Sequence, residues 1–214
     1  MPKKSLSSLE LAALVQELQF LVGSRITQVY QPEKKEILLQ LNVPRQGKVL
    51  LRIISGKFVF PTERKETPVQ PSSFCLQLRK YLNNATLKEL KQQDAERIVV
   101  FTVEKEELYL LIVELFARGN IILTDKNGSI IGVLEQQHQK ERIVKVKEQY
   151  VFPTVGVNWK ELTEKKLSEI LQHSQKKSVV ISLATELGLG GVYAEELCRR
   201  ANVEKGTMPT EVKK

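Results

Sequence analysis

Residues 108–135 constrain the fold of this chain more than any other stretch. They hold three apolar runs rich in Val, Ile, Leu and aromatic residues, separated by Arg118-Gly119-Asn120 and by Asp125-Lys126-Asn127-Gly128. Asn127-Gly128 between two apolar runs is typical of a β-hairpin, because both residues tolerate the positive φ of a type I′ turn. The sequence therefore predicts consecutive strands in the core of a sheet.

Arg118-Gly119-Asn120 interrupts this sheet without the polar residues that usually flank a loop. Two interpretations stay open. Arg118 either marks a bulge that breaks the strand, or its side chain is directed at something. In the second interpretation its partner lies either outside the chain or on a carboxylate such as Glu114.

The chain before residue 108 is also mostly sheet. Residues 7–22 have the apolar spacing of an amphipathic helix, begun by a capping box of Ser7 and Glu10 and ended by Gly23. A helix is also expected at 72–82. The expected strands are 25–31, 36–42, 48–55, 58–60, 86–92 and 97–104.

The pattern changes after residue 135. Residues 136–149 are polar and basic, and helices are then expected at 163–173, 176–187 and 191–202. We expect an α+β fold, with an antiparallel β-rich domain at residues 1–153 and a small helical module at 154–205. Residues 206–214 are polar and are expected to form a flexible tail.

The chain is basic, with 33 Lys and Arg against 25 Asp and Glu, a formal net charge of +8. Such a balance favours polyanionic partners, which are nucleic acids or, less often, anionic membrane surfaces. The alternative is that the charge serves solubility alone. We expect a nucleic-acid partner.

Cysteine and hydropathy exclude several classes of protein. The two cysteines, Cys75 and Cys198, lie far apart in apolar helical patterns, so neither a disulfide framework nor a four-ligand zinc site is expected. Both are expected to be small core residues of a reducing compartment. No apolar run is long enough to span a bilayer. We therefore expect a cytoplasmic protein without cofactor, metal or membrane partner.

Few motifs carry chemistry of their own. Gly188-Leu189-Gly190-Gly191 before a helix either cradles a phosphate or is a plain turn between helices. Glu96-Arg97 either is a charged entrance to a strand or is a carboxylate that orients an arginine toward phosphate. His138 and His173 stand alone, and no nucleophile, base and orienting group occur together. The sequence does not predict an enzyme.

A family resemblance is carried by segments spread in order over nearly the whole chain. They are Ser8-Leu9-Glu10-Leu11, Gly23-Ser24-Arg25, Val29-Tyr30, Pro71-Ser72-Ser73-Phe74, Leu78-Arg79-Lys80-Tyr81-Leu82, Glu96-Arg97-Ile98-Val99, Glu114-Leu115-Phe116-Ala117-Arg118-Gly119-Asn120-Ile121, Leu123-Thr124-Asp125 and Gly188-Leu189-Gly190-Gly191. With these segments the chain resembles the N-terminal part of the NFACT family, ribosome quality-control factors of the NEMF and RqcH type that are also called fibronectin-binding protein A-like.

The resemblance implies a fold and a set of partners. The fold is similar to the N-terminal domain of formamidopyrimidine-DNA glycosylases, followed by a helix-hairpin-helix-like module. The implied partners are tRNA and the large ribosomal subunit, with its rRNA, that holds a stalled peptidyl-tRNA. The implied role is to support C-terminal alanine tailing of the stalled nascent chain. Family members continue into a coiled coil and a C-terminal domain, so this chain is expected to be a fragment.

The resemblance also implies site residues. The family's tRNA positions, an early acidic residue and an Asp-Arg pair, fall here on Glu10 and on Glu96-Arg97, so both family aspartates are glutamates in this chain. Arg97, Arg118, Arg79 and Lys80 are expected to contact phosphate. Glu10 and Glu96 are expected to orient arginines or to accept hydrogen bonds from bases or 2′-hydroxyls.

Two other functions stay open as alternatives. The first is a glycosylase-like enzyme that uses the amine of Pro2. The glycosylases place glutamate after that proline, where this chain has Lys3, and most carry a zinc finger, for which two cysteines are too few. The second is surface adhesion, because relatives carry the name fibronectin-binding protein.

Overall fold

The computed structural model describes residues 4–65, 70–138, 142–153 and 156–212. The chain folds into two compact units. The first comprises Met1–Leu6, Leu11–Gln93 and Arg97–Pro153, and the second comprises Ser7–Glu10, Asp94–Glu96 and Thr154–Lys214. The chain is α+β, as expected, with an antiparallel sheet followed by a helical C-terminal region.

Within the described residues the sheet has nine strands, in the order β4-β3-β2-β1-β5-β6-β7-β8-β9. Neighbouring strands are antiparallel. The strands are β1 Arg25–Tyr30, β2 Glu36–Val43, β3 Gly47–Ile54, β4 Phe58–Thr62, β5 Thr86–Gln92, β6 Ile98–Glu104, β7 Leu108–Glu114, β8 Asn120–Asp125 and β9 Ile130–Val133. A short separate ribbon pairs β10 (Gln137–His138) with β11 (Ile143–Val144).

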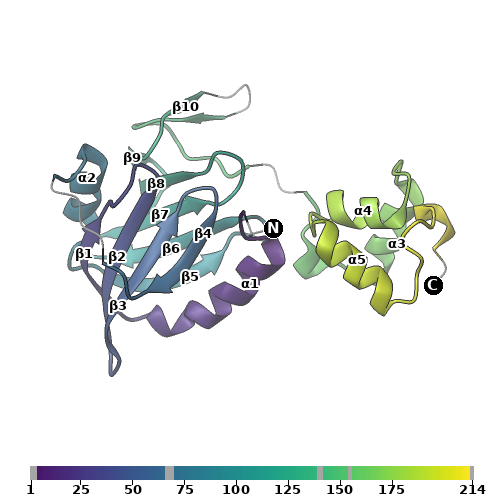
Figure 1. The fold of residues 1–214 in the computed structure, drawn as a ribbon. Helices are drawn as coiled ribbons and strands as arrows, with labels where there is room; N and C mark the ends of the chain where they lie inside the picture. Colours follow the sequence, from purple (N-terminus) through teal and green to yellow (C-terminus); the bar gives the residue numbers. More distant parts are fainter. Residues whose placement is uncertain (1–3, 66–69, 139–141, 154–155, 213–214) are drawn as a thin grey trace. The chain divides into compact units, whose positions relative to one another are not determined.

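The sheet curls, so that its two halves share one core. Alternate residues of β2 and β3 and alternate residues of β6, β7 and β8 belong to the same buried cluster. Helix α2 (Ser73–Leu82) packs against both β1 and β9, which lie far apart in the strand order. Figure 1 shows β2 and β3 in front of β6 and β7. A smaller apolar cluster covers the other face of β6–β9 with Val144, Tyr150 and Phe152.

Helix α1 (Ser8–Glu17) begins as the sequence predicts. The backbone N–H of Ser7 donates to Oε2 of Glu10 over 2.8 Å, and the Glu10 N–H donates back to Ser7 Oγ over 3.3 Å, which completes the capping box. The last turn tightens into the 3₁₀ helix η1 (Leu18–Leu21), whose Leu18 and Leu21 are buried. Gly23, with φ +85°, then turns the chain into β1.

The β8–β9 hairpin forms, but its turn is not the expected type I′, because Asn127 lacks a positive φ. The Gly128 N–H donates to Asp125 O over 3.1 Å, and Gly128 alone is left-handed, at φ +85°. Oδ1 of Asp125 accepts from the N–H groups of Asn127 and Ser129, both over 2.9 Å. The aspartate therefore stabilises a four-residue turn, Asp125 to Gly128, in which the left-handed Gly128 forms a bulge.

The second unit is helical. It contains η2 (Trp159–Glu161), α3 (Glu164–His173), α4 (Val179–Thr185), α5 (Gly191–Arg200) and η3 (Pro209–Glu211). Thr163 caps α3, as predicted, whereas α4 begins three residues later than the expected 176. Gly188 and Gly190, with φ of +66° and +79°, form the turn between α4 and α5.

The chain after residue 205 packs within this second unit as far as it is described. The Val179 N–H donates to Thr207 O over 2.7 Å, and Pro209 is buried. Cys75 and Cys198 are free and buried in separate cores, as the sequence predicts. Among the described residues no helix is long and apolar enough to cross a bilayer.

Candidate nucleic-acid interface

Four chain reversals of the first unit meet at one place, which we call the turn cluster. They are residues 31–35 between β1 and β2, residues 55–57 between β3 and β4, Arg97 before β6, and residues 115–119 between β7 and β8. Backbone hydrogen bonds tie them together. Ser55 N–H donates to Lys35 O (2.9 Å), Gly56 N–H to Glu114 O (3.0 Å), and Leu115 N–H to Arg97 O (2.8 Å). The curl of the sheet therefore brings distant turns together.

Gly119 lies directly against the β3–β4 turn. A Cβ atom on Gly119 would lie 2.0 Å from the backbone N of Gly56, and φ is +69° at Gly119 and +77° at Gly56. No side chain fits at Gly119, because the backbone of the β3–β4 turn lies against it.

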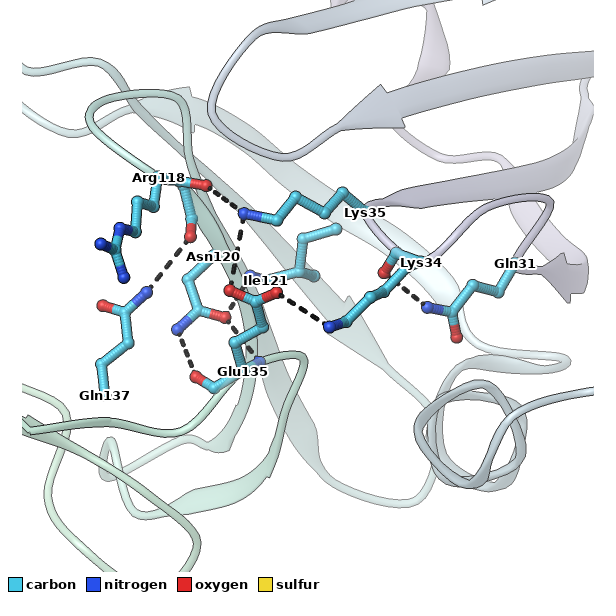
Figure 2. A network of polar contacts seen from close by, with 9 residues as sticks. Gln31, Lys34, Lys35, Arg118, Asn120, Ile121, Glu135 and Gln137 are labelled. Atoms are coloured by element: carbon cyan, nitrogen blue, oxygen red, sulfur yellow. Dashed lines mark hydrogen bonds and ion pairs between the residues drawn. The ribbon is translucent and has the colours of Figure 1, made fainter.

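Asn120 has a structural role. It is fully buried at the start of β8, and its Nδ2 donates to Glu135 O over 2.8 Å. Its Oδ1 accepts from the N–H groups of Ile121 (3.0 Å) and Glu135 (3.2 Å), as Figure 2 shows. The side chain thus fixes the chain after β9 against the start of β8.

Arg118 has an exposed side chain. Its backbone O accepts from Lys35 Nζ over 3.0 Å, but its guanidinium has no hydrogen-bond or ion-pair partner in the described part of the chain. Of the two sequence interpretations, the one that ties Arg118 to Glu114 is not what the structure has. The guanidinium is available to an external ligand.

Glu114 is instead paired inside the first unit. It is 1% exposed, and its Oε1 accepts from Arg142 over 2.7 Å and from the Tyr150 hydroxyl over 2.8 Å. Burial, and then the negative charge of Glu114, raise the pKa of the Tyr150 hydroxyl. These two hydrogen bonds fasten residues on either side of β11 to the end of β7.

Two lysines of the turn cluster were missed by the sequence reasoning. Lys34 and Lys35 lie 3.9 and 3.5 Å from the carboxylate oxygens of Glu135 (Figure 2). The available signal was a pair of adjacent lysines in the turn after Pro32. Lys57 is also exposed in the β3–β4 turn. The turn cluster therefore gathers five cationic side chains, those of Lys34, Lys35, Lys57, Arg97 and Arg118.

Arg97 lies just outside β6 and is partly exposed. Its backbone O accepts a hydrogen bond from the Leu115 N–H, whereas its guanidinium has no polar partner among the residues that the structure describes. The Leu115–Arg97 bond places the Arg97 bend beside the β7–β8 loop that carries Arg118. The structure thus brings together the segments of these two predicted arginines.

The two predicted acidic residues, Glu10 and Glu96, belong to the second unit. Ser8 Oγ donates to Ala95 O and accepts from Trp159 Nε1 over 2.9 Å, so the segments of Glu10 and Glu96 are neighbours. Burial, and then a hydrogen bond to Glu10, raise the pKa of the Tyr193 hydroxyl. Glu10 therefore has structural contacts beside its capping role.

Arg79 and Lys80, on the last turn of α2, are placed differently. Arg79 Nε donates to Val29 O over 2.8 Å, and its guanidinium lies 5.8 Å from the Tyr30 ring, so Arg79 anchors α2 on β1. Lys80 is exposed, with Nζ 5.4 Å from the Tyr81 ring. Within the described ranges, neither side chain has a hydrogen bond or ion pair to the turn cluster.

Other predicted features offer little chemistry. His138 is exposed, and Nδ1 of His173 contacts Glu169 O at 2.7 Å. Among the described residues no group of three or more His, Cys, Asp or Glu is placed to hold a metal ion. Pro2, the residue of the glycosylase alternative, lies outside the described residues.

Comparison with known proteins finds relatives that match nearly the whole chain. Residues 7–214 match the family of NFACT N-terminal and middle domains. The chain is 31% identical to the archaeal Rqc2 homolog aRqcH of Methanocaldococcus jannaschii, over 95% of this chain and 32% of that protein. It is 32% identical to the ribosome quality control complex subunit NEMF of Homo sapiens, over 99% of this chain and 20% of that protein. The chain therefore spans about a third or less of these relatives.

Two solved structures have the same fold as this chain over more than nine tenths of its length. The N-terminal domain of the fibronectin-binding protein PavA from Streptococcus pneumoniae has a TM-score of 0.80 at 29% identity, covering 92% of this chain and 79% of that one. The N-terminal part of the fibronectin/fibrinogen-binding protein from Streptococcus suis has a TM-score of 0.82 at 30% identity, covering 94% and 81%. The chain therefore belongs to the NFACT family and is homologous to the Rqc2, NEMF and RqcH ribosome quality-control factors.

Proposed function

We propose that this chain is the RNA-binding part of a ribosome quality-control factor. It binds tRNA and the large ribosomal subunit, with its rRNA, that holds a stalled peptidyl-tRNA, and it supports C-terminal alanine tailing of the stalled chain. The observation that carries the proposal is the turn cluster, where the guanidinium groups of Arg97 and Arg118 have no partner among the described residues. A guanidinium without a carboxylate partner is suited to bidentate phosphate binding.

The roles of the site residues follow from this proposal. Arg97 and Arg118 contact phosphates, with Lys34 and Lys35 adding positive charge beside Arg118. Glu10 and Glu96 are acceptors for bases or 2′-hydroxyls or orient arginines. Arg79 and Lys80 are assigned peripheral phosphate contacts from α2, because Arg79 is already engaged with β1. The net charge of +8 supports a polyanionic partner.

The finer organisation is part of the same proposal. Residues 1–153 form the NFACT N-terminal domain, similar to that of the formamidopyrimidine-DNA glycosylases, residues 154–205 the helix-hairpin-helix-like module, and 206–214 a tail. The protein acts in the cytoplasm as a binding module and not as an enzyme. The relatives that support a ribosomal partner are named ribosome quality control complex subunits.

The proposal is tested by tRNA binding of the Arg97→Ala variant. Loss of one charge-assisted contact is expected to weaken tRNA affinity by about 1–3 kcal/mol, roughly 5- to 150-fold. The matched control is Arg45→Ala, because Arg45 is exposed in the β2–β3 turn and lies outside the turn cluster. Gel-shift titration measures both, with circular dichroism to show that each variant folds. Unchanged affinity of folded Arg97→Ala would remove Arg97 from the interface.

A second function is suggested by the names of the solved relatives, which describe proteins that bind fibronectin. If this chain were an adhesin, it would bind immobilised fibronectin with an affinity that Arg97→Ala and Arg118→Ala change no more than Arg45→Ala does. Binding of tRNA that is lost in the arginine variants, without retention on fibronectin, favours the RNA-binding function.

A further inference from the structure

A groove of about 450 Å³ opens beside the turn cluster. One wall is the β7–β8 loop from Phe116 to Gly119, and the other is the segment from Glu135 to His138; the buried Glu114 also lines it. The volume lies within the range of small-ligand sites, roughly 300–1,000 Å³.

The two walls of the groove are fixed to each other. Asn120, fully buried, bonds both the N–H and the C=O of Glu135, and Gln137 Nε2 donates to Gly119 O over 3.2 Å. Gly119 is itself held against Gly56. A groove whose walls are set before a ligand arrives costs little ordering entropy on binding.

The carboxylates of the groove are already neutralised. Glu114 is paired with Arg142, and Glu135 with Lys34 and Lys35. Arg118 adds a positive charge with no partner in the described structure. The groove therefore does not repel an anion, although two glutamates line it.

The polar groups that remain are those that recognise bases. Gln136 and His138 have exposed side chains without hydrogen-bond partners among the described residues. The Gln137 carboxamide donates from Nε2 to Gly119 O, and its Oε1 accepts no hydrogen bond from the described residues. Figure 2 shows the side chains of Arg118 and Gln137 pointing toward each other. Carboxamides pair their donor and acceptor with base edges, and an arginine beside them holds a phosphate.

We propose that this groove binds one unpaired nucleotide of an RNA strand. The base contacts Gln136, Gln137 and His138, with the Phe116 ring lining the groove, and Arg118 holds the adjacent phosphate. An acidic peptide also offers backbone N–H and C=O groups to the carboxamides, and the test therefore includes a tetraglutamate peptide. The inference rests on the proposed RNA-binding function and names the part of the RNA that is recognised.

The test is an NMR titration of the ¹⁵N-labelled chain with AMP, CMP, GMP and UMP. At least one nucleotide is expected to shift the side-chain NH₂ signals of Gln136 and Gln137 and the Nε–H of Arg118 in a saturable way. The double variant Gln136→Ala/His138→Ala, which breaks no hydrogen bond of the described structure, is expected to lose the Gln137 shift and to weaken tRNA binding roughly 3- to 10-fold. Gln46→Ala, at an exposed glutamine of the β2–β3 turn, serves as control.

Three results would overturn the inference. They are equal shifts with inorganic phosphate alone, shifts with a tetraglutamate peptide but with no nucleotide, and silent carboxamides together with unchanged tRNA affinity of the double variant. If that last result accompanies a loss of tRNA binding in Arg97→Ala, the groove inference fails and the proposed function stands. If the unmodified chain does not bind tRNA, the proposed function fails, and the nucleotide titration still decides whether the groove binds nucleotides.

Discussion

The consecutive residues Arg118, Gly119 and Asn120 have three different physical roles. Arg118 exposes a guanidinium without a partner among the described residues, Gly119 allows two backbones to touch, and Asn120 satisfies three backbone groups from a buried position. The sequence singled out this triplet but left its role open, because the partner of Gly119 is Gly56, far away in the chain.

Gly119→Ala should be strongly destabilising. Its cost combines a left-handed backbone, about 1–2 kcal/mol, with a clash against backbone that has little freedom to move, about 1–3 kcal/mol more. Gly47→Ala is the control, because φ is +79° there but no atom lies within 4 Å of the added Cβ. Urea unfolding followed by circular dichroism measures the sheet, since the single tryptophan, Trp159, lies in the second unit. Equal losses in the two variants would show that the contact is not tight.

Tyr150 should make stability depend on alkaline pH. Burial and Glu114 raise its pKa above the ordinary value of 10.0, so the folded chain keeps this proton where the unfolded chain loses it. Stability from this group is complete below about pH 10 and falls by about 1.4 kcal/mol per pH unit above it. Tyr150→Phe removes this dependence and costs roughly 1.5–3 kcal/mol at neutral pH, the value of a hydrogen bond to a charged group.

The difference in free energy of unfolding between the unmodified chain and Tyr150→Phe is therefore expected to be constant up to about pH 10 and to narrow above it. Other tyrosines titrate in both proteins and cancel in the difference. A difference that stays constant to about pH 11.5 would contradict the buried pairing with Glu114.

At the scale of elements, caps set where helices begin. Ser72 Oγ accepts from the Cys75 N–H over 3.0 Å and donates to Oε1 of Gln31, so one hydroxyl caps α2 and ties it to the turn cluster. Ser72→Ala is expected to cost about 1–2 kcal/mol in urea unfolding. Ser73→Ala, next along the chain, should change stability by less than about 0.5 kcal/mol, because its exposed side chain has no hydrogen bond in the described structure. A loss no larger for Ser72 than for Ser73 would exclude this cap.

The elements were predictable where their signals are local. The strand β5 was predicted at residues 86–92, where it is found, and the Thr163 cap gave the start of α3. The prediction of a type I′ turn between β8 and β9 was wrong. The Asp125 side chain accepts from two backbone N–H groups and stabilises a turn in which only Gly128 has a positive φ. The Glu114–Arg142 pair joins residues 28 positions apart and has no local signal. Periodicity shows which face of a strand is buried, but not which distant turns meet when the sheet curls.

At the scale of the whole molecule, part of the positive charge behind the net charge of +8 is concentrated in the turn cluster. Lys34, Lys35, Arg97 and Arg118 come from turns that are separated by up to about 80 residues in sequence and are joined by backbone hydrogen bonds. Composition predicted a polyanion as partner, and the sequence singled out Arg97 and Arg118. That Lys34 and Lys35 belong to the same cluster became apparent only from the folded structure.

The most direct test of this account is the salt dependence of tRNA affinity. For the unmodified chain the logarithm of the association constant should fall linearly with the logarithm of salt concentration, because phosphate contacts release counterions. Each lost contact lowers the slope by about 0.7–0.9, so Arg97→Ala/Arg118→Ala should lower it by about 1.4–1.8, and Arg45→Ala should leave it unchanged. A slope that the double variant does not change, or that Arg45→Ala changes equally, would contradict an RNA interface at the turn cluster.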